Sequence, residues 1–331
     1  MKVKLHGNRV LITAIIATLL AVTGSNCQST PSPKSEHEMA ELSAVTLGVG
    51  EKLQVATTTN VLADVVAIVG GDRIALTTLM GVGVDPHSYV PTPADVAAVH
   101  NAHVVFASGA GLETNLEEIL ASAGGEAARI YVSQGLKLRL APDESSSEEE
   151  AAAHDHKGGD PHVWFSVPNV IAWVGTIEGT LSALDPANAA AYAVNARAYV
   201  EELESLDAWV MAQVATIPET NRRLVTNHPA FGYLADRYGL DLVGAVYPVS
   251  PSSEPSAQDL AALEEAIRAY GVPAVFTEST VNPRLAEQMA QDTGVRLVPL
   301  YTGSLGGPGS GVESYVELMR YDVEAIVGAL K

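Results

Sequence analysis

Short apolar runs alternate with helix-like stretches along most of the chain. Eight runs are rich in β-branched residues or bounded by glycine and polar residues, a pattern that predicts strands. The expected strands are Leu53–Thr58, Ile74–Met80, Val104–Ser108, Ala128–Val132, Arg223–Thr226, Leu240–Val246, Ala274–Thr277 and Arg296–Leu300. The helices expected around them are Val61–Val69, Pro93–Asn101, Glu113–Ala123, Phe231–Tyr238, Gln258–Tyr270, Pro283–Thr293 and Val312–Leu330. Four strand–helix units followed by four more indicate an α/β protein of two lobes, each a mostly parallel four-stranded sheet flanked by helices.

The stretch between the two sets of strands has a different pattern. From Asn169 to Thr216 no strand is indicated, and Pro186–Thr216 is rich in Ala, Glu and Leu. With Asp185 as N-cap and Pro186 at the first helical position, this helix would be about 46 Å long at 1.5 Å per residue. It is either a long surface helix or a rigid helix that joins the two lobes and leaves a cleft between them. We expect an N-terminal lobe over 51–168, a connecting helical region over 169–217 and a C-terminal lobe over 218–331.

Composition limits the classes of function. The chain has 331 residues, enough for about two domains, and its 47% hydrophobic and 18% charged residues are ordinary for a globular protein. A formal net charge of −20 repels nucleic acids and favours cations. The single cysteine excludes a disulfide framework and a cysteine-rich metal cluster within the chain. A metal site would therefore have to use histidine and carboxylate ligands.

The first 27 residues have the layout of a secretory signal. Met1–Arg9 carries three basic residues, Val10–Val22 is apolar, and small or polar residues lead to Cys27. The apolar run is short for a membrane-spanning helix. We therefore expect an exported protein that resides in the periplasm or at the outer face of the cytoplasmic membrane.

Cys27 stands directly after this signal and before a polar tether over 28–50. The arrangement resembles a bacterial lipoprotein, in which the cysteine is acylated and holds the protein on the membrane. Gly24 and Asn26 depart from the usual pattern, which has Leu three residues before the cysteine and a small residue just before it. We favour lipidation of Cys27 over a conventional signal peptide with an incidental cysteine.

One low-complexity segment interrupts the first lobe. Residues 143–160 read DESSSEEEAAAHDHKGGD and carry His154 and His156 among carboxylates. The segment is either a solvated loop or a weak cation-collecting flap, because two imidazoles amid carboxylates can hold a divalent ion loosely.

Three of the nine histidines lie beside a turn-forming proline. They occur as Asp85-Pro86-His87, Asp160-Pro161-His162 and Asn227-His228-Pro229. A neighbouring proline presents the imidazole on a stiff turn, and the adjacent Asp or Asn is able to accept a ring N–H and leave the other nitrogen for a metal.

The positions of these histidines also favour a ligand site. His87 follows the expected strand Ile74–Met80, and His228 comes directly after Arg223–Thr226. Ligands of open α/β sheets bind outside the carboxyl ends of the strands. Each histidine alone would be read as structural, as we read His100 and His103, which are expected to cap or to lie at the surface. The three together predict a metal site.

Longer segments resemble the metal-binding solute receptors of bacterial ABC importers, the zinc/manganese group. They are DPHSYVPTPAD at 85–95, DPHVW at 160–164, TNHPAFGYLADRYGL at 226–240, EPS at 254–256 and SLGGPGSGVESYVELMRYD at 304–322. The resemblance runs in order over about 53–330. It implies two α/β lobes bridged by one long rigid helix, a metal in the cleft, and His87, His162 and His228 as its ligands. It also implies an ABC permease and its ATPase as partners, and we expect a monomer.

The identity of the metal and of its fourth ligand depends on the chemistry of the donor atoms. Three neutral imidazoles suit Zn²⁺ better than Mn²⁺, which prefers more carboxylate ligands. Many members of the group have an Asp just before Ser-Leu-Gly, where this chain has Gly303. Either water or Glu278, at the end of a predicted strand in the same lobe, would take the fourth position; Glu278 is otherwise a supporting carboxylate.

Two other functional classes were weighed. A zinc hydrolase also uses three histidines and an open position, but no HExxH or GxSxG motif occurs, so we do not expect an enzyme. A metal-sequestering or adhesin-like surface lipoprotein has the same sequence features as a receptor.

Overall fold

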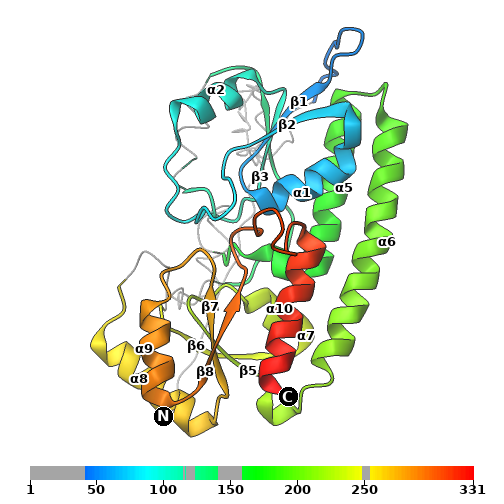
Figure 1. Ribbon diagram of the computed structural model, residues 1–331. Helices are drawn as coiled ribbons and strands as arrows, with labels where there is room; N and C mark the ends of the chain where they lie inside the picture. Colours follow the sequence, from blue (N-terminus) through cyan, green and yellow to red (C-terminus); the bar gives the residue numbers. More distant parts are fainter. Residues whose placement is uncertain (1–41, 115, 117–123, 141–158, 248–253) are drawn as a thin grey trace, which may run out of the picture. The chain divides into compact units, whose positions relative to one another are not determined.

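The computed structural model describes residues 42–114, 116, 124–140, 159–247 and 254–331, all within one compact unit (Figure 1). The signal segment, Cys27, most of the tether, His154, His156 and most of the expected helix Glu113–Ala123 lie outside the described residues. Among the described helices none is long and apolar enough to cross a membrane.

The first sheet has the strand order β2-β1-β3-β4, and every neighbouring pair is parallel. Its strands are β1 (Leu53–Thr57), β2 (Ile74–Thr78), β3 (Val104–Ala107) and β4 (Ala128–Tyr131). Helices α1 (Asn60–Gly70) and α2 (Pro93–Asn101) connect them. Successive strand residues face opposite sides: Val55 joins the large core shared with α1, whereas Ala56 joins a smaller cluster with Val99 of α2. Both faces of this parallel sheet are therefore covered.

The second sheet repeats this arrangement with the order β6-β5-β7-β8, again parallel throughout. Its strands are β5 (Arg223–Thr226), β6 (Asp241–Ala245), β7 (Ala274–Glu278) and β8 (Arg296–Leu300). The helices of this lobe are α7 (Gly232–Tyr238), α8 (Ala257–Tyr270), α9 (Arg284–Thr293) and α10 (Tyr315–Leu330). Val275 packs with residues of α8 and α9 in one cluster, and Phe276 packs on the opposite face in the core that contains α10.

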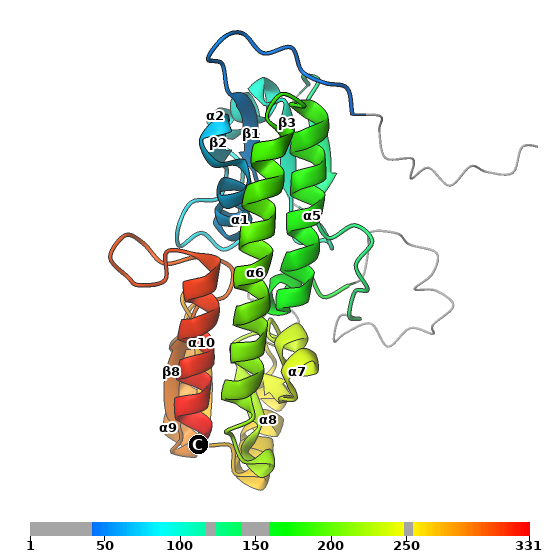
Figure 2. The same ribbon diagram turned by 90° about the vertical axis from the view of Figure 1, so that its right-hand side faces the viewer.

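Two helices, rather than one, make up the connecting region. The turn η2 (Val163–Phe165) leads into α5 (Val167–Leu184), and α6 (Ala189–Val214) follows. Helix α6 packs against α5, against α1 of the first lobe and against α10 of the second, as Figure 2 shows. Its buried side chains recur at helical spacing; they are Tyr192, Ala196, Tyr199, Leu203, Leu206, Val210 and Val214. The joining helix predicted from the sequence is thus α6, about 39 Å long at 1.5 Å per residue.

The predicted start of that helix was wrong by three residues. Asp185 is not its N-cap but the C-cap of α5, because its backbone N–H bonds to the carbonyl of Leu181 and continues the preceding helix. The Asp185 carboxylate accepts hydrogen bonds from Asn188 Nδ2 (2.7 Å) and the Tyr192 hydroxyl (2.8 Å). It therefore anchors the turn between the helices, and Pro186 lies within that turn.

All eight predicted strands are present, with ends within two residues of the expected ones. The last helix begins at Tyr315 and not at Val312, because Ser314 caps it in a capping box with Glu317.

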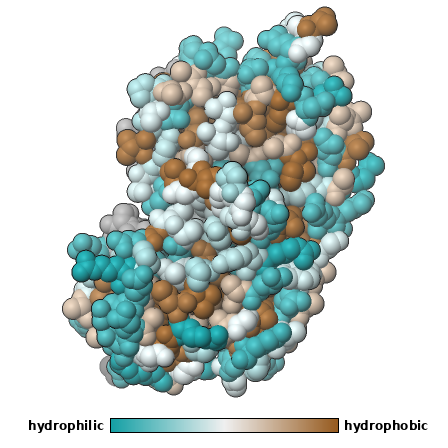
Figure 3. Space-filling model, in the orientation of Figure 1, coloured by the Kyte–Doolittle hydropathy of each residue, from teal (hydrophilic) through white to brown (hydrophobic). Residues whose placement is uncertain are grey.

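Hydrophilic and hydrophobic side chains are interspersed over the face shown in Figure 3. Since the burial pattern places both sheets between helix layers, the loops at the strand ends are free to build a site.

Candidate metal centre

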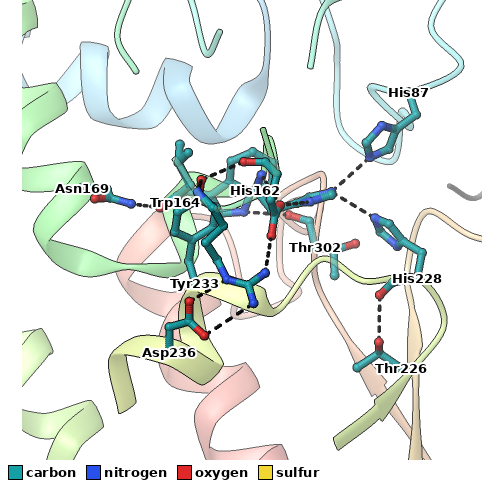
Figure 4. Close-up of polar contacts among 12 residues, drawn as sticks. His87, His162, Trp164, Asn169, Thr226, His228, Tyr233, Asp236 and Thr302 are labelled. Atoms are coloured by element: carbon teal, nitrogen blue, oxygen red, sulfur yellow. Dashed lines mark hydrogen bonds and ion pairs between the residues drawn. The ribbon is translucent and has the colours of Figure 1, made fainter. Parts of the chain in front are cut away.

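Three histidines from separate loops meet in one place (Figure 4). His87 lies in the loop between β2 and α2, His162 caps the turn η2 ahead of α5, and His228 follows β5 directly. Two of these loops follow the carboxyl ends of parallel strands, where α/β folds bind ligands. The positions of His87 and His228 are therefore those expected for ligand-binding residues of an α/β fold. His162 instead lies just before η2 and α5, where the connecting helices begin.

The three rings present their Nε2 atoms to one another. His162 Nε2 lies 3.1 Å from His87 Nε2 and 3.0 Å from His228 Nε2. Each residue offers one nitrogen such that all three lie within 4.8 Å of one another. Nitrogens bound to one zinc ion at about 2.0–2.1 Å in tetrahedral geometry lie about 3.3 Å apart. The observed group therefore has the size of a single-ion site.

A buried acidic residue orients His162. Asp160 Oδ1 lies 2.9 Å from His162 Nδ1 and also accepts a hydrogen bond from the His162 backbone N–H. The other carboxylate oxygen of Asp160 pairs with Arg139 at 3.2 Å, and Arg139 pairs in turn with Asp236 at 2.6 Å. The Tyr233 hydroxyl donates to the Asp160 carbonyl. With Nδ1 facing a carboxylate, Nε2 is the nitrogen left for a metal.

His228 has its own carboxylate partner, and it is not the neighbouring Asn227. Glu278 Oε2 lies 2.6 Å from His228 Nδ1, and Glu278 Oε1 accepts a hydrogen bond from the His228 backbone N–H at 2.9 Å. Thr226 donates its hydroxyl to the His228 carbonyl at 2.8 Å. The Glu278 carboxylate thus contacts the side of the ring that faces away from the other two histidines.

His87 is fixed through its backbone and is less buried than the other two. Its N–H donates to Asp85 Oδ1 at 3.0 Å, while Ser88 donates its hydroxyl to Asp85 Oδ2. Asp85 therefore holds the turn that carries His87, whereas Asp160 contacts both the backbone and the ring of His162. The expectation that a neighbouring Asp or Asn contacts the ring is right for His162 and wrong for His228.

Burial favours the neutral form of His87 and His162. Burial lowers the pKa of His87 to about 2, and the rings of His162 and His228 add to this effect. Burial likewise lowers the pKa of His162, against the opposing influence of Asp160. Burial alone would raise the pKa of the Glu278 carboxyl, but its contacts with His228 hold it below the ordinary value. Neutral imidazoles carry the free lone pairs that a metal requires.

Sequence reasoning did not identify several residues that support the site. No pattern pointed to Arg139, which lies 21 residues before Asp160, and Tyr233 stands within the segment 226–240 but was not singled out. Trp164 stands in the DPHVW segment and donates its indole N–H to the carbonyl of Thr302 at 3.2 Å, which connects η2 to the loop after β8. His103 is structural, since its Nδ1 accepts a hydrogen bond from the Gln54 N–H.

Comparison with known proteins agrees with this fold. A model of the family described as zinc-uptake complex component A, periplasmic, matches residues 55–329, and the chain belongs to that family. It is 33% identical over 282 residues to the manganese-binding lipoprotein MntA of Halalkalibacterium halodurans, covering 85% of this chain and 89% of the relative. It is 32% identical over 328 residues to MntA of Bacillus subtilis, covering 97% and 99%.

Solved structures show the same architecture. The periplasmic zinc-binding protein TroA from Treponema pallidum superposes with a TM-score of 0.76 at 31% identity, over 85% of this chain and 99% of the other. A manganese-bound periplasmic metal-binding protein from Candidatus Liberibacter asiaticus gives a TM-score of 0.75 at 26% identity, over 85% and 100%.

Family membership settles the general class. The chain is an extracytoplasmic substrate-binding protein of a metal importer and not an enzyme. The prediction of a receptor is confirmed, and the zinc hydrolase is excluded.

Proposed function

We propose that the protein captures Zn²⁺ outside the cytoplasmic membrane and delivers it to an ABC permease driven by its ATPase. The observation that carries this proposal is the convergence of His87, His162 and His228 through their Nε2 atoms. The ligands come from both lobes and from the connecting region, so an ion bound to all three fixes the lobes against each other. Acidic surface charge, with a net charge of −20, favours approach of a cation.

The donor atoms favour zinc over manganese. The group that the described residues offer consists of three imidazole nitrogens and no carboxylate oxygen. Imidazole suits zinc, whereas manganese is bound preferentially by carboxylate, carbonyl and water oxygens. Relatives carry both names: the two MntA proteins are called manganese-binding, and TroA is called zinc-binding. We base the choice of zinc on the ligand set and not on the names.

Glu278 supports the site in this proposal and does not ligate the metal. Its carboxylate already contacts the Nδ1 and backbone N–H of His228, on the side of the ring away from the other nitrogens. A carboxylate behind a ligating histidine fixes the ring and raises its basicity. A water molecule then takes the fourth coordination position.

The metal is released in this proposal because the second lobe carries His228, whereas His87 and His162 lie outside it. When the permease draws the two lobes apart, His228 leaves with the second lobe, and the ion remains with His87 and His162. A two-histidine site holds zinc far less tightly than a three-histidine site, so separation of the lobes lowers affinity without any chemical change in the protein.

Two parts of the proposal concern residues outside the described ranges. Lipidation of Cys27 would hold the receptor on the membrane beside its permease. His154 and His156 in the acidic segment 143–160 would collect zinc loosely. We further propose that the receptor acts as a monomer, since one chain supplies all three histidines.

Metal analysis and thermal unfolding test the proposal. Protein purified without chelators should contain about one zinc per chain, and saturating zinc should raise the melting temperature of chelator-treated protein, because a ligand at 100 times Kd adds about 2.7 kcal/mol to stability. His228→Ala should abolish the shift, whereas His103→Gln, a histidine outside the site, should retain it. A wild-type protein that neither carries zinc nor is stabilised by it contradicts the proposal.

A transport assay separates the receptor from a sequestering lipoprotein. Cells that express the receptor with its permease and ATPase should accumulate zinc, and cells that lack only the permease should not. Accumulation that is independent of the permease supports sequestration.

A further inference from the structure

Gly303 lies in the loop after β8, directly before Ser304, and the space beside it is filled. A Cβ atom added at Gly303 would lie 2.7 Å from Cδ and 3.1 Å from Cγ of Pro86. Both residues are buried, and the backbone of Gly303 does not adopt a positive φ. Glycine at this position is therefore required by the close approach of Pro86 and not by backbone conformation.

Pro86 cannot yield to such an atom without moving His87. Its ring is closed onto the backbone and has no rotamer that turns away. The next residue is His87, whose Nε2 lies 3.1 Å from His162 Nε2. A retreat of Pro86 by about 1 Å, enough to restore ordinary contact, would exceed the tolerance of about 0.2 Å on a zinc–ligand distance.

The segment that carries Gly303 is also unable to retreat freely. Ser304 Oγ accepts hydrogen bonds from the Gly83 N–H at 2.8 Å and from Asn60 Nδ2 at 3.0 Å. Asn60 Oδ1 accepts a hydrogen bond from the Leu305 N–H at 2.8 Å. These bonds join the loop after β8 in the second lobe to α1 and the loop after β2 in the first. Because several of the bonded groups are buried, breaking the bonds would leave unsatisfied polar atoms.

We infer that Gly303 is a positioning residue that lets the His87 loop seat against the second lobe, which brings His87 into the metal site and keeps the protein ligands at three nitrogens. The inference rests on the proposed function of the site. In this arrangement the proline ring occupies the space that a side chain at position 303 would need, so position 303 supplies no ligand and the fourth coordination position belongs to water or another small ligand from solution.

Substitution of Gly303 by Ala tests the steric part. Gly303→Ala should weaken zinc binding more than tenfold in a competition titration against a chromophoric chelator. The matched control is Gly307→Ala in the same loop, where an added Cβ would only reach 3.9 Å from Val82 Cγ1 and no positive φ is present. This control should bind zinc within twofold of wild type. Equal binding by Gly303→Ala and wild type would overturn the inference.

A double-mutant cycle shows whether the effect passes through Pro86. Pro86→Ala removes the two ring atoms that the new methyl group would meet. In that background Gly303→Ala should therefore cost less than about threefold. The same loss in both backgrounds would contradict the inference. If the wild type and Gly307→Ala also fail to bind zinc, the proposed function itself is wrong, which distinguishes the two failures.

Cobalt spectroscopy and folding controls complete the test. Visible absorption of the Co²⁺-loaded protein depends on the number of histidine ligands. Gly303→Ala should give a spectrum similar to that of His87→Ala, and the Pro86→Ala, Gly303→Ala double variant should recover the three-histidine spectrum. Far-UV circular dichroism of the metal-free variants checks folding. A folded Gly303→Ala protein with an unchanged cobalt spectrum overturns the inference.

Discussion

Glu278 holds His228 by two contacts at once: one carboxylate oxygen lies 2.6 Å from the ring Nδ1, and the other accepts the backbone N–H of the same residue. Glu278 and His228 are both almost fully buried, and Glu278 ends β7 while His228 follows β5. Adjacent strands of the second sheet thus supply a proposed ligand and the carboxylate that contacts it.

Removing this carboxylate should weaken zinc binding without abolishing it. Glu278→Gln keeps the shape of the side chain but loses the negative charge behind the imidazole, so the zinc affinity should fall about 10- to 100-fold. Glu287→Gln, an exposed position on α9, serves as the control and should bind as wild type does. Chelator competition measures both. A loss as large as that of His228→Ala would indicate that Glu278 is itself a ligand.

Asp160 should behave in the same way for His162. Asp160→Asn removes the charge that faces His162 Nδ1 and leaves Arg139 without one of its two carboxylate partners. We expect a 10- to 100-fold lower zinc affinity. Asp236 pairs with the same arginine but is mostly exposed, so Asp236→Asn should change affinity by less than twofold. Equal effects of the two variants would show that the arginine, and not the carboxylate behind the ring, is what matters.

The metal-free protein should lose stability as the pH falls below about 6.5. Burial lowers the pKa of both His87 and His162 in the folded state, so between pH 6.5 and the lower folded values the unfolded chain binds more protons than the native one. Stability therefore rises with pH in this window and falls on acidification. Urea unfolding at pH 7, 6 and 5 measures the slope.

The double variant His87→Gln, His162→Gln is the control for this pH dependence. It should show a flatter slope between pH 5 and 7, because it lacks the two groups that the unfolded state protonates. A slope as steep as that of the wild type would assign the pH dependence to other residues.

The turn between α5 and α6 gives a test of stability that does not involve the site. Asp185→Ala removes the acceptor of the buried Tyr192 hydroxyl and should lower the free energy of unfolding by about 1–3 kcal/mol. Adding Tyr192→Phe removes the orphaned hydroxyl and should recover part of the loss. Urea denaturation measures both, and zinc affinity should stay unchanged. A single variant as stable as the wild type would contradict the role given to Asp185.

Local patterns were sufficient for the eight strands and for locating the three histidines, but they did not predict α5. The strands Arg223–Thr226 and Arg296–Leu300 were predicted to the residue. The proline-flanked histidines were found because their turns are encoded within three residues. The start of α6 was missed because Asp185 and Pro186 look like a helix start, and only the packing of Tyr192 on Asp185 shows that they form a turn.

Contacts between distant segments could not be predicted in this way. Glu278 was nominated as a ligand or a supporting residue, and the choice depended on which side of His228 it would face. The approach of Pro86 to Gly303 joins positions more than two hundred residues apart. Such contacts depend on how the two lobes meet, which neither periodicity nor composition records.

Because helix α6 packs against both lobes and is long, a small tilt of one lobe produces a large displacement of its loops. A lobe that tilts by about 3° moves its loops by about 1 Å at a distance of about 20 Å, half the length of this helix, and a zinc–nitrogen bond tolerates only about 0.2 Å. The displacement of the loops therefore exceeds the change that a metal–ligand bond tolerates. In the proposed mechanism a permease therefore needs only a slight tilt of one lobe to release the metal.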